Sequence, residues 1–338
     1  MPAIDYFNPY AYLMRARRAL YERGALKSEH PGIPVISIGN LTLGGTGKSP
    51  LVVNVANYLH ERHGKRVAVV SRGYRRRSKG FVLVRDGGEI LVPVEDSGDE
   101  ARMLAEMLPD AIIIVDENRV HGARAAKNLG AEVIMLDDGY QHLRLRRNLN
   151  ILLFDASQRT QNVIPFGRLR EPVAAIHAAD VALLTNASEE KETIPEKMDR
   201  FVRPDAVRAS LRAVPRSLEP IGDSHAITMD TLKGKRVFAV SSIASPRRFH
   251  DMLRTLGVEV ISRDLGDHAN YSESIVKCIL RDVTKAGADA IITTAKDAVK
   301  SRRYFEAMMI SIPAYILHQD LEFLQGEDRF YVAIDDTL

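Results

Sequence analysis

Short runs of apolar residues alternate with helical patterns along the first half of the chain. The runs lie at residues 35–38, 67–70, 112–115, 133–136, 151–154 and 181–184. Between them, apolar residues recur at intervals of three and four, as in the stretches 51–59 and 101–108, which is typical of helices with one buried face. This alternation predicts βαβ units, and therefore an α/β fold with a buried, mostly parallel sheet and helices on both of its faces.

A second, shorter series of the same kind occupies the last third of the chain. Its apolar runs, which predict strands, lie at 237–240, 258–261 and 290–293. Its helical patterns lie near 246–256 and 272–284. The stretch 189–223 is richer in charge and proline, which favours a connection between two lobes. We therefore predict a first domain at residues 1–222 and a second, smaller α/β lobe at residues 223–338.

Composition narrows the functional classes. Hydrophobic residues make up 45% and charged residues 27% of the chain, as in an ordinary folded globular protein. The 47 basic and 44 acidic side chains nearly balance, and the arginines are scattered apart from one loop, so no nucleic-acid partner is expected. The single cysteine, Cys278, excludes an intrachain disulfide and a cysteine-based zinc site. No apolar run approaches the roughly 18 residues that a membrane-spanning helix needs.

A glycine-rich loop between the first strand and the first helical pattern has the spacing of a P-loop. Its glycines allow backbone N–H groups to turn toward phosphates, Lys48 would reach the β- and γ-phosphates, and the Ser49 hydroxyl would bind Mg²⁺. Thr42 stands where the usual pattern has a glycine. The alternative is a glycine-rich turn with a chance Lys-Ser pair. The predicted nucleotide-binding residues are Gly44, Gly45, Thr46, Gly47, Lys48, Ser49 and Pro50.

Two carboxylates follow the apolar run at residues 133–136. Asp137 and Asp138 would lie at the carboxyl end of a strand, where open α/β sheets bind their ligands. A P-loop needs such a group for its metal ion, so we predict a Mg²⁺ site formed by Ser49, Asp137 and Asp138. Side chains alternate along a strand, so the two carboxylates should point differently, and only one of them need contact the ion directly. One of them could instead cap a turn before Gly139.

Six short segments appear in the order that one family shows. They are residues 40–50 (NLTLGGTGKSP), 71–74 (SRGY), 98–100 (GDE), 137–142 (DDGYQH), 167–172 (GRLREP) and 267–268 (DH). Together they resemble the tetraacyldisaccharide 4'-kinases, the lipid A 4'-kinase family of P-loop kinases. The resemblance implies an enzyme that uses ATP and Mg²⁺ to phosphorylate the 4'-hydroxyl of tetraacyldisaccharide 1-phosphate, the lipid A disaccharide 1-phosphate precursor, which gives lipid IVA.

The resemblance also implies roles for individual residues. Asp99 and His268 would pair to accept the proton of the sugar hydroxyl, assembled as the second lobe closes over the active site, and Lys48 would assist the transfer. Without the resemblance, Asp99 could be a helix N-cap and His268 a surface-loop histidine. A second histidine, common in the family, is replaced here by Ala269. The implied substrate contacts are Arg119, Gln141, His142, Arg170 and Glu171.

The N-terminal residues carry an aromatic and apolar stripe together with a group of arginines. The stripe includes Tyr6, Phe7, Tyr10, Leu13, Met14 and Leu20. This composition predicts an amphipathic helix that contacts the membrane, although a helix packed on the protein core would show a similar stripe. For a lipid acceptor, we expect peripheral attachment to the cytoplasmic face of the inner membrane, and a monomer.

Two other functions remain open from the residues alone. A P-loop kinase for a water-soluble small molecule would share the nucleotide site, as would a regulatory or assembly ATPase gated by its nucleotide. The basic loop at residues 72–79 is either a solvated turn or a flap that meets phosphates. Formation of a phosphorylated product, and its solubility, would separate the three functions.

Overall fold

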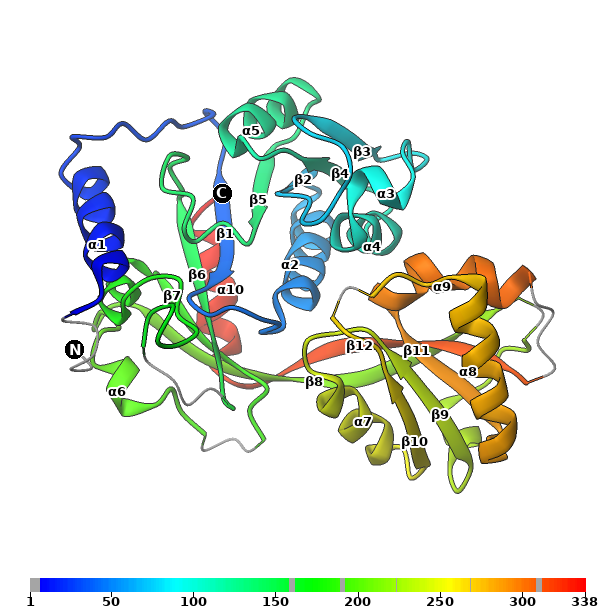
Figure 1. Cartoon of the computed structure of the whole chain (residues 1–338). Helices are drawn as coiled ribbons and strands as arrows, with labels where there is room; N and C mark the ends of the chain where they lie inside the picture. The colour runs from blue at the N-terminus through cyan, green and yellow to red at the C-terminus, as the bar shows by residue number, and fades with distance from the viewer. Residues whose placement is uncertain (1–6, 158–161, 189–191, 223, 268, 308–311) are drawn as a thin grey trace. The chain divides into compact units, whose positions relative to one another are not determined.

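The computed structural model describes residues 7–157, 162–188, 192–222, 224–267, 269–307 and 312–338 (Figure 1). The chain divides into two compact units. Unit 1 comprises Met1–Ser97, Leu104–Ala213 and Leu321–Leu338. Unit 2 comprises Gly98–Met103 and Val214–Asp320. The predicted division after residue 222 differs from this one, because the C-terminal stretch belongs to unit 1 and a short segment near residue 100 belongs to unit 2.

Unit 1 is built on a mostly parallel sheet with the strand order β7-β6-β1-β5-β2-β4-β3. Its strands are β1 (Val35–Asn40), β2 (Val67–Ser71), β3 (Val82–Asp86), β4 (Ile112–Val115), β5 (Val133–Asp137), β6 (Leu149–Asp155) and β7 (Val181–Thr185). Only β3 runs antiparallel to its neighbour among these pairs. The central strands are buried along their whole length, as continuous apolar runs predict for a sheet covered on both faces.

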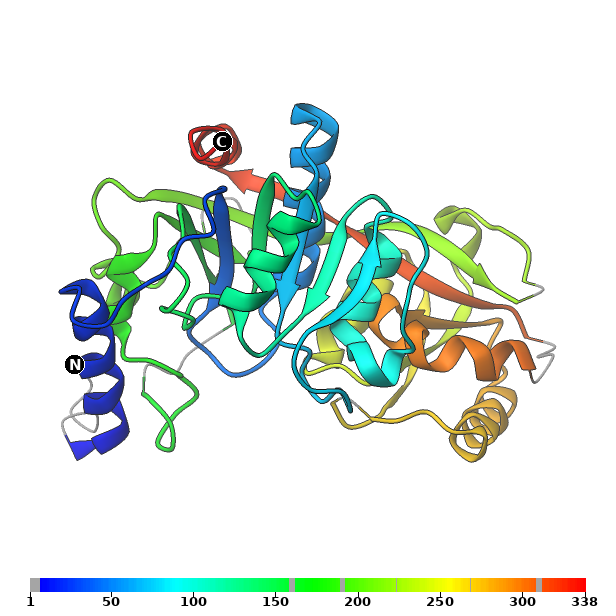
Figure 2. The ribbon, with the colours of Figure 1, turned by 90° about the horizontal axis from the view of Figure 1, so that it is seen from above.

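Helices cover the unit 1 sheet. They are α1 (Pro9–Glu22), α2 (Lys48–His63), α3 (Val94–Ser97), α5 (Arg119–Asn128), α6 (Glu196–Asp199) and α10 (Glu327–Asp335), with a 3-10 helix at Val173–Ala178. Helix α4 (Asp99–Met107) has residues in both units. Helix α5 packs on the face that carries Val70 and Leu136, and α2 covers the opposite face (Figure 2). The predicted α/β class, with helices on both faces, is confirmed.

Unit 2 is built on parallel strands in the order β10-β9-β11-β12, which belong, in the described part of the chain, to the same twelve-stranded sheet. The strands are β9 (Arg236–Ser241), β10 (Glu259–Asp264), β11 (Ala290–Thr294) and β12 (Ala314–Gln325). The helices are α7 (Pro246–Thr255), α8 (Glu273–Ala286) and α9 (Ala295–Ala307), with a 3-10 helix at Met229–Leu232. The core of this unit includes Phe238, Ile279 and Phe305. The strands and helices predicted after residue 235 are thus present.

The connection that the sequence predicted at residues 189–223 is in part a long strand. Strand β8 (Val207–Ile221) begins in unit 1 and ends in unit 2, and it contains Pro215 and Pro220. The chain passes from unit 1 to unit 2 between Ala213 and Val214, inside the predicted connection. Proline is tolerated in a strand wherever its missing N–H is not needed for the ladder. Strand β12 returns the chain to unit 1, which explains why a boundary based on sequence order was incomplete.

Candidate active site

The predicted P-loop connects β1 to α2. Gly44 and Gly47 have φ values of 116° and 80°, a region that glycine enters without steric cost. Gly47 is the N-cap of α2 and brings no side chain to cap the helix, so the positive end of the helix dipole faces the loop. Lys48 and Ser49 begin the helix, and Pro50 lies in the first turn, where its missing N–H is tolerated. The loop has the geometry of a phosphate site.

Thr42, the departure from the usual P-loop pattern, is buried beneath the loop. Its hydroxyl accepts a hydrogen bond of 3.1 Å from Asn40 Nδ2, and its backbone forms an isolated bridge with Leu169. The threonine therefore ties the start of the loop to the segment that precedes Arg170. A glycine at this position would leave the Asn40 amide without this acceptor.

The two aspartates at the end of β5 face different partners, as alternation along the strand predicts. Asp137 is buried, and its Oδ2 accepts a hydrogen bond of 3.2 Å from Ser71 Oγ. Asp138 has a φ of 54°, and its Oδ1 lies 3.6 Å from Lys48 Nζ. The strand end thus brings one carboxylate to the P-loop lysine. The other is held by the neighbouring strand.

Arg170 holds Asp138 with two hydrogen bonds. Its Nη1 and Nη2 donate to the two carboxylate oxygens at 2.7 and 2.8 Å, the forked geometry that an arginine makes with a carboxylate. Burial raises the pKa of Asp138, but the hydrogen bonds from Arg170 and the charge of Lys48 hold that pKa well below its usual range. Asp138 is therefore ionised at every physiological pH.

Asn40 is a site residue that the sequence reading did not single out. Its side-chain oxygen accepts hydrogen bonds from Lys48 Nζ at 3.2 Å and from Arg170 Nη2 at 2.5 Å. Its backbone oxygen accepts from Gln141 Nε2 at 2.9 Å. A polar side chain at the end of an otherwise apolar strand was the signal that could have identified it, since such positions face the ligand edge of the sheet.

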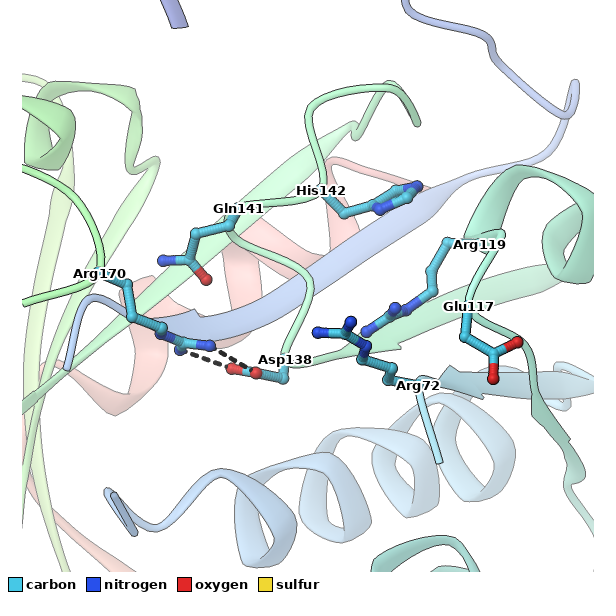
Figure 3. Close-up of a pocket in the computed structure, with 7 residues that line it drawn as sticks. All are labelled: Arg72, Glu117, Arg119, Asp138, Gln141, His142 and Arg170. Carbon is cyan, nitrogen blue, oxygen red and sulfur yellow. Dashed lines mark hydrogen bonds and ion pairs between the residues drawn. The ribbon is translucent and has the colours of Figure 1, made fainter. Parts of the chain in front are cut away.

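A pocket of about 280 Å³ lies beside Asp138 (Figure 3). Arg170 reaches the aspartate from one side of the pocket, and the guanidinium groups of Arg72 and Arg119 point toward it from the other. The lining residues are Arg72, Glu117, Arg119, Asp138, Gln141, His142 and Arg170. Four of the five predicted substrate contacts therefore lie together: Arg119, Gln141, His142 and Arg170.

Burial and crowded positive charge shape the chemistry of this pocket. Burial lowers the pKa of Arg119, and the carboxylates of Asp138 and Asp137 partly offset this effect. Burial, followed by the charges of Arg119 and nearby arginines, lowers the pKa of His142 to about 4. His142 is therefore neutral near pH 7, and its buried Nε2 has no hydrogen-bond partner among the residues that the structure describes. The pocket presents hydrogen-bonding groups within a positive field, which suits an anionic, hydroxyl-bearing ligand.

Glu171, the fifth predicted contact, does not line the pocket. It is 1% exposed, and its Oε2 accepts hydrogen bonds of 2.9 and 2.5 Å from Arg18 of α1. Two further contacts join the same helix to the pocket segments: Tyr10 Oη donates to the Arg170 carbonyl at 3.0 Å, and Arg17 donates to the Gln141 carbonyl at 3.2 Å. Helix α1 thus holds the backbone of Arg170, which binds Asp138, and of Gln141.

The basic loop that follows β2 is anchored by Glu117. Arg76 donates to Glu117 Oε1 at 2.8 Å, and the Gly80 backbone N–H donates to Oε2 at 2.9 Å. Ser78 Oγ donates to the Asp96 carbonyl at 2.6 Å. The loop is therefore fixed at several points, and Arg72 at its start enters the pocket.

Asp99, the predicted base, is the first residue of α4 and belongs to unit 2. Its Oδ2 lies 2.7 Å from Lys300 Nζ of α9. Its predicted partner, His268, lies outside the described residues, so the pairing stays a prediction. Asp267 and Ala269, which flank His268 in the sequence, are both in unit 2.

Comparison with known protein families shows to which family this chain belongs. The family model LpxK, described as tetraacyldisaccharide-1-P 4'-kinase, matches residues 8–338. The chain belongs to this family. The match covers residues of both units.

Relatives in the family align with this chain along most of their length. A tetraacyldisaccharide 4'-kinase of Desulfotalea psychrophila is 39% identical over 311 residues, which cover 90% of this chain and 88% of the relative. The Geobacter sulfurreducens enzyme of the same name is 38% identical over 313 residues, covering 91% and 86%. The crystal structure of an "apo" form of LpxK from Aquifex aeolicus in complex with ATP matches with a TM-score of 0.77 and 30% identity, covering 99% of this chain and 97% of that one. The predicted family and fold are thus confirmed.

Proposed function

We infer that this protein is an ATP-dependent kinase that phosphorylates the 4'-hydroxyl of tetraacyldisaccharide 1-phosphate in lipid A biosynthesis. Family membership over nearly the whole chain supports the reaction. The observation that carries the inference within the structure is the junction of the P-loop with the end of β5, where Lys48 lies 3.6 Å from Asp138. This junction combines a phosphate cradle with a metal-binding carboxylate.

The residues present fit Mg-ATP. Gly44 and Gly47 open the loop for phosphate oxygens, and the uncapped start of α2 favours negative charge. The hydroxyl of Ser49 and the carboxylates of Asp137 and Asp138 are hard oxygen ligands, which Mg²⁺ prefers, and would hold the ion. Bound there, Mg²⁺ would neutralise charge on the transferring phosphate.

The pocket beside Asp138 is the proposed acceptor site. Arginine forks match phosphate geometry, and the acceptor carries a phosphate at its 1-position, so Arg119 and Arg170 are proposed contacts together with Arg72. Gln141 and the neutral imidazole of His142 can hydrogen-bond sugar hydroxyls. Glu171 would act by holding Arg18 of α1, which keeps the Arg170 segment in place.

Asp99 of unit 2 is the proposed general base, and His268 is its proposed partner. A sugar hydroxyl becomes an effective nucleophile when its proton is accepted during bond formation. An ionised carboxylate next to an ammonium group remains available for that role. The Asp99–Lys300 ion pair supports an ionised Asp99.

Helix α1 is the proposed membrane contact. Among the described helices, none combines the length and apolar character needed to cross a bilayer. While one face of α1 holds the pocket segments, Phe7 beside it is 86% exposed and Leu13 is 61% exposed. Helix α1 therefore combines the two roles that the N-terminal stripe allowed: one face packs on the protein, and the other is exposed for contact with the membrane interface. We propose peripheral attachment at the cytoplasmic face of the inner membrane, with a monomer as the active species.

Transfer of label from γ-labelled ATP to tetraacyldisaccharide 1-phosphate, with Mg²⁺ and detergent, tests the function. The wild type should form labelled lipid, and Lys48→Ala should form none while Lys65→Ala, just beyond the other end of α2, behaves as wild type. Release of inorganic phosphate without labelled lipid would instead indicate a regulatory ATPase. Labelling of a water-soluble sugar but not of the lipid would indicate a small-molecule kinase.

A further inference from the structure

Lys300 on α9 is a buried lysine whose ammonium group contacts one carboxylate and one backbone carbonyl. It is 8% exposed, its Nζ lies 2.7 Å from Asp99 Oδ2, and it donates a hydrogen bond of 2.9 Å to the Ala269 carbonyl. Burying an ammonium group costs free energy unless the charge is paired and hydrogen-bonded. Both conditions are met here, and the two partners come from segments far apart in the sequence.

The first turn of α9 fixes the segment around Ala269 at a second point. Asp297 is fully buried one turn before Lys300, and its carboxylate accepts hydrogen bonds from Tyr271 Oη at 3.1 Å and from the Ser242 backbone N–H at 3.0 Å. Burial, followed by the Asp297 charge, raises the pKa of Tyr271, which therefore remains a hydrogen-bond donor. Lys300 thus projects from a helix whose first turn is hydrogen-bonded, through the buried Asp297, to Tyr271 and Ser242.

We propose that Lys300 is a positioning residue for phosphoryl transfer, which orients the Asp99 carboxylate and keeps it ionised. The inference rests on the proposed function and on the role of Asp99 in it. An ammonium group has three donors, and the structure uses two of them to tie Asp99 to the Ala269 carbonyl, next in sequence to His268. An opposite charge this close favours the ionised carboxylate, the form that accepts a proton.

The chain supplies a matched control one turn earlier on the same helix. Lys296 Nζ lies 3.3 Å from Glu100 Oε1, so two lysines of α9 pair with two consecutive acidic residues of α4. The charged groups near Asp99 include Lys300 and this neighbouring pair. Loss of either lysine removes one charge and one ion pair, and Lys300 is the one whose Nζ lies 2.7 Å from the proposed base.

The experiment compares Lys300→Met, Lys296→Met and Lys300→Arg in the labelled-transfer assay across a range of pH. We expect Lys300→Met to lower kcat by about 10- to 100-fold, a part of the roughly 10²- to 10⁴-fold that general base catalysis contributes. Its KM for ATP should stay within about twofold, and the acidic limb of its kcat profile should move to higher pH, because the carboxyl has lost its cation. Lys300→Arg should restore the acidic limb, and Lys296→Met should match the wild type.

A double variant keeps the inference testable if Lys300→Met lowers stability. In an Asp99→Asn background, Lys300→Met should lower kcat little further, since both changes act through one group. Equal effects of Lys300→Met and Lys296→Met, or a lower kcat with an unchanged pH profile and a lower Tm, would show a structural role only and overturn the inference. If the wild type forms no labelled lipid, the proposed function fails, and the inference fails with it. If the wild type forms labelled lipid and Lys300→Met has the same kcat and pH profile as the wild type, the inference alone fails.

Discussion

The pocket of unit 1 and the Asp99 segment of unit 2 differ in the balance between positive and negative side chains. The pocket is lined by three arginines and two carboxylates, so positive charge is in excess there. In unit 2, Asp99 and Lys300 lie 2.7 Å apart and neutralise each other. The first arrangement favours an added anion, whereas the second preserves an ionised carboxylate. In the proposed mechanism, binding and proton transfer therefore fall to residues of different units.

The largest effects are expected from replacing one aspartate in each unit. Asp138→Asn removes a proposed Mg²⁺ ligand and the partner of Arg170, so Mg-ATP affinity should fall at least about tenfold along with activity. Asp99→Asn should leave Mg-ATP affinity near that of the wild type and lower kcat by about 10²- to 10⁴-fold. Nucleotide titration and steady-state kinetics measure the two effects.

Asp110→Asn, at an exposed site, serves as the control for both variants and should change neither quantity. The comparison breaks down if Asp99→Asn weakens nucleotide binding as much as Asp138→Asn does. In that case the two units would share the binding role.

The ion pair beneath the pocket predicts the next largest effect. Arg18→Met leaves the Glu171 carboxylate buried without its partner, so the free energy of unfolding should fall by about 3–5 kcal/mol. Chemical denaturation measures this loss. The double variant Arg18→Met with Glu171→Gln should recover part of it, because the unpaired charge is gone.

Arg23→Met, at the exposed end of α1, is the matched control and should change stability by no more than about 0.5 kcal/mol. If Arg18→Met matched this control, α1 would not be anchored through Glu171.

Protonation of His142 gives a smaller and more local test of the unit 1 field. Its pKa of about 4 lies below the unperturbed value of about 6.5. Between these values the unfolded chain binds a proton that the folded site does not, so this group lowers stability as pH falls from about 6.5 to 4. NMR titration should find the imidazole neutral at pH 6, with His142→Gln assigning the resonance. A midpoint near 6.5 would contradict a positively charged pocket.

The smallest expected effect concerns the exposed face of α1. Leu13→Ser should weaken binding to anionic liposomes about threefold to tenfold in a flotation assay, because one large apolar side chain leaves the interface. Val332→Ser removes a similarly exposed apolar side chain from α10 and should have no effect. Equal binding by both variants would exclude α1 as the membrane contact.

Local pattern predicted the elements whose function depends on adjacent residues. Strand β1, the glycine loop and α2 follow one another in sequence, so spacing alone identified Lys48 and Ser49. The local sequence pattern could not predict contacts between distant segments, which include those of Asn40 with Arg170, Arg18 with Glu171, and Lys300 with Asp99. The return of β12 to unit 1 was missed for the same reason, because pairing over long sequence separation leaves no periodic signal.

The position of the transferred phosphate tests the central claim most directly. After reaction with ATP and tetraacyldisaccharide 1-phosphate, the lipid product can be examined by ¹H–³¹P correlation NMR. The account predicts a new phosphorus signal correlated with the proton at the 4'-carbon, besides the original signal at the 1-position. A product phosphorylated at another hydroxyl, or a lipid that gains no phosphate while ATP is consumed, would contradict it.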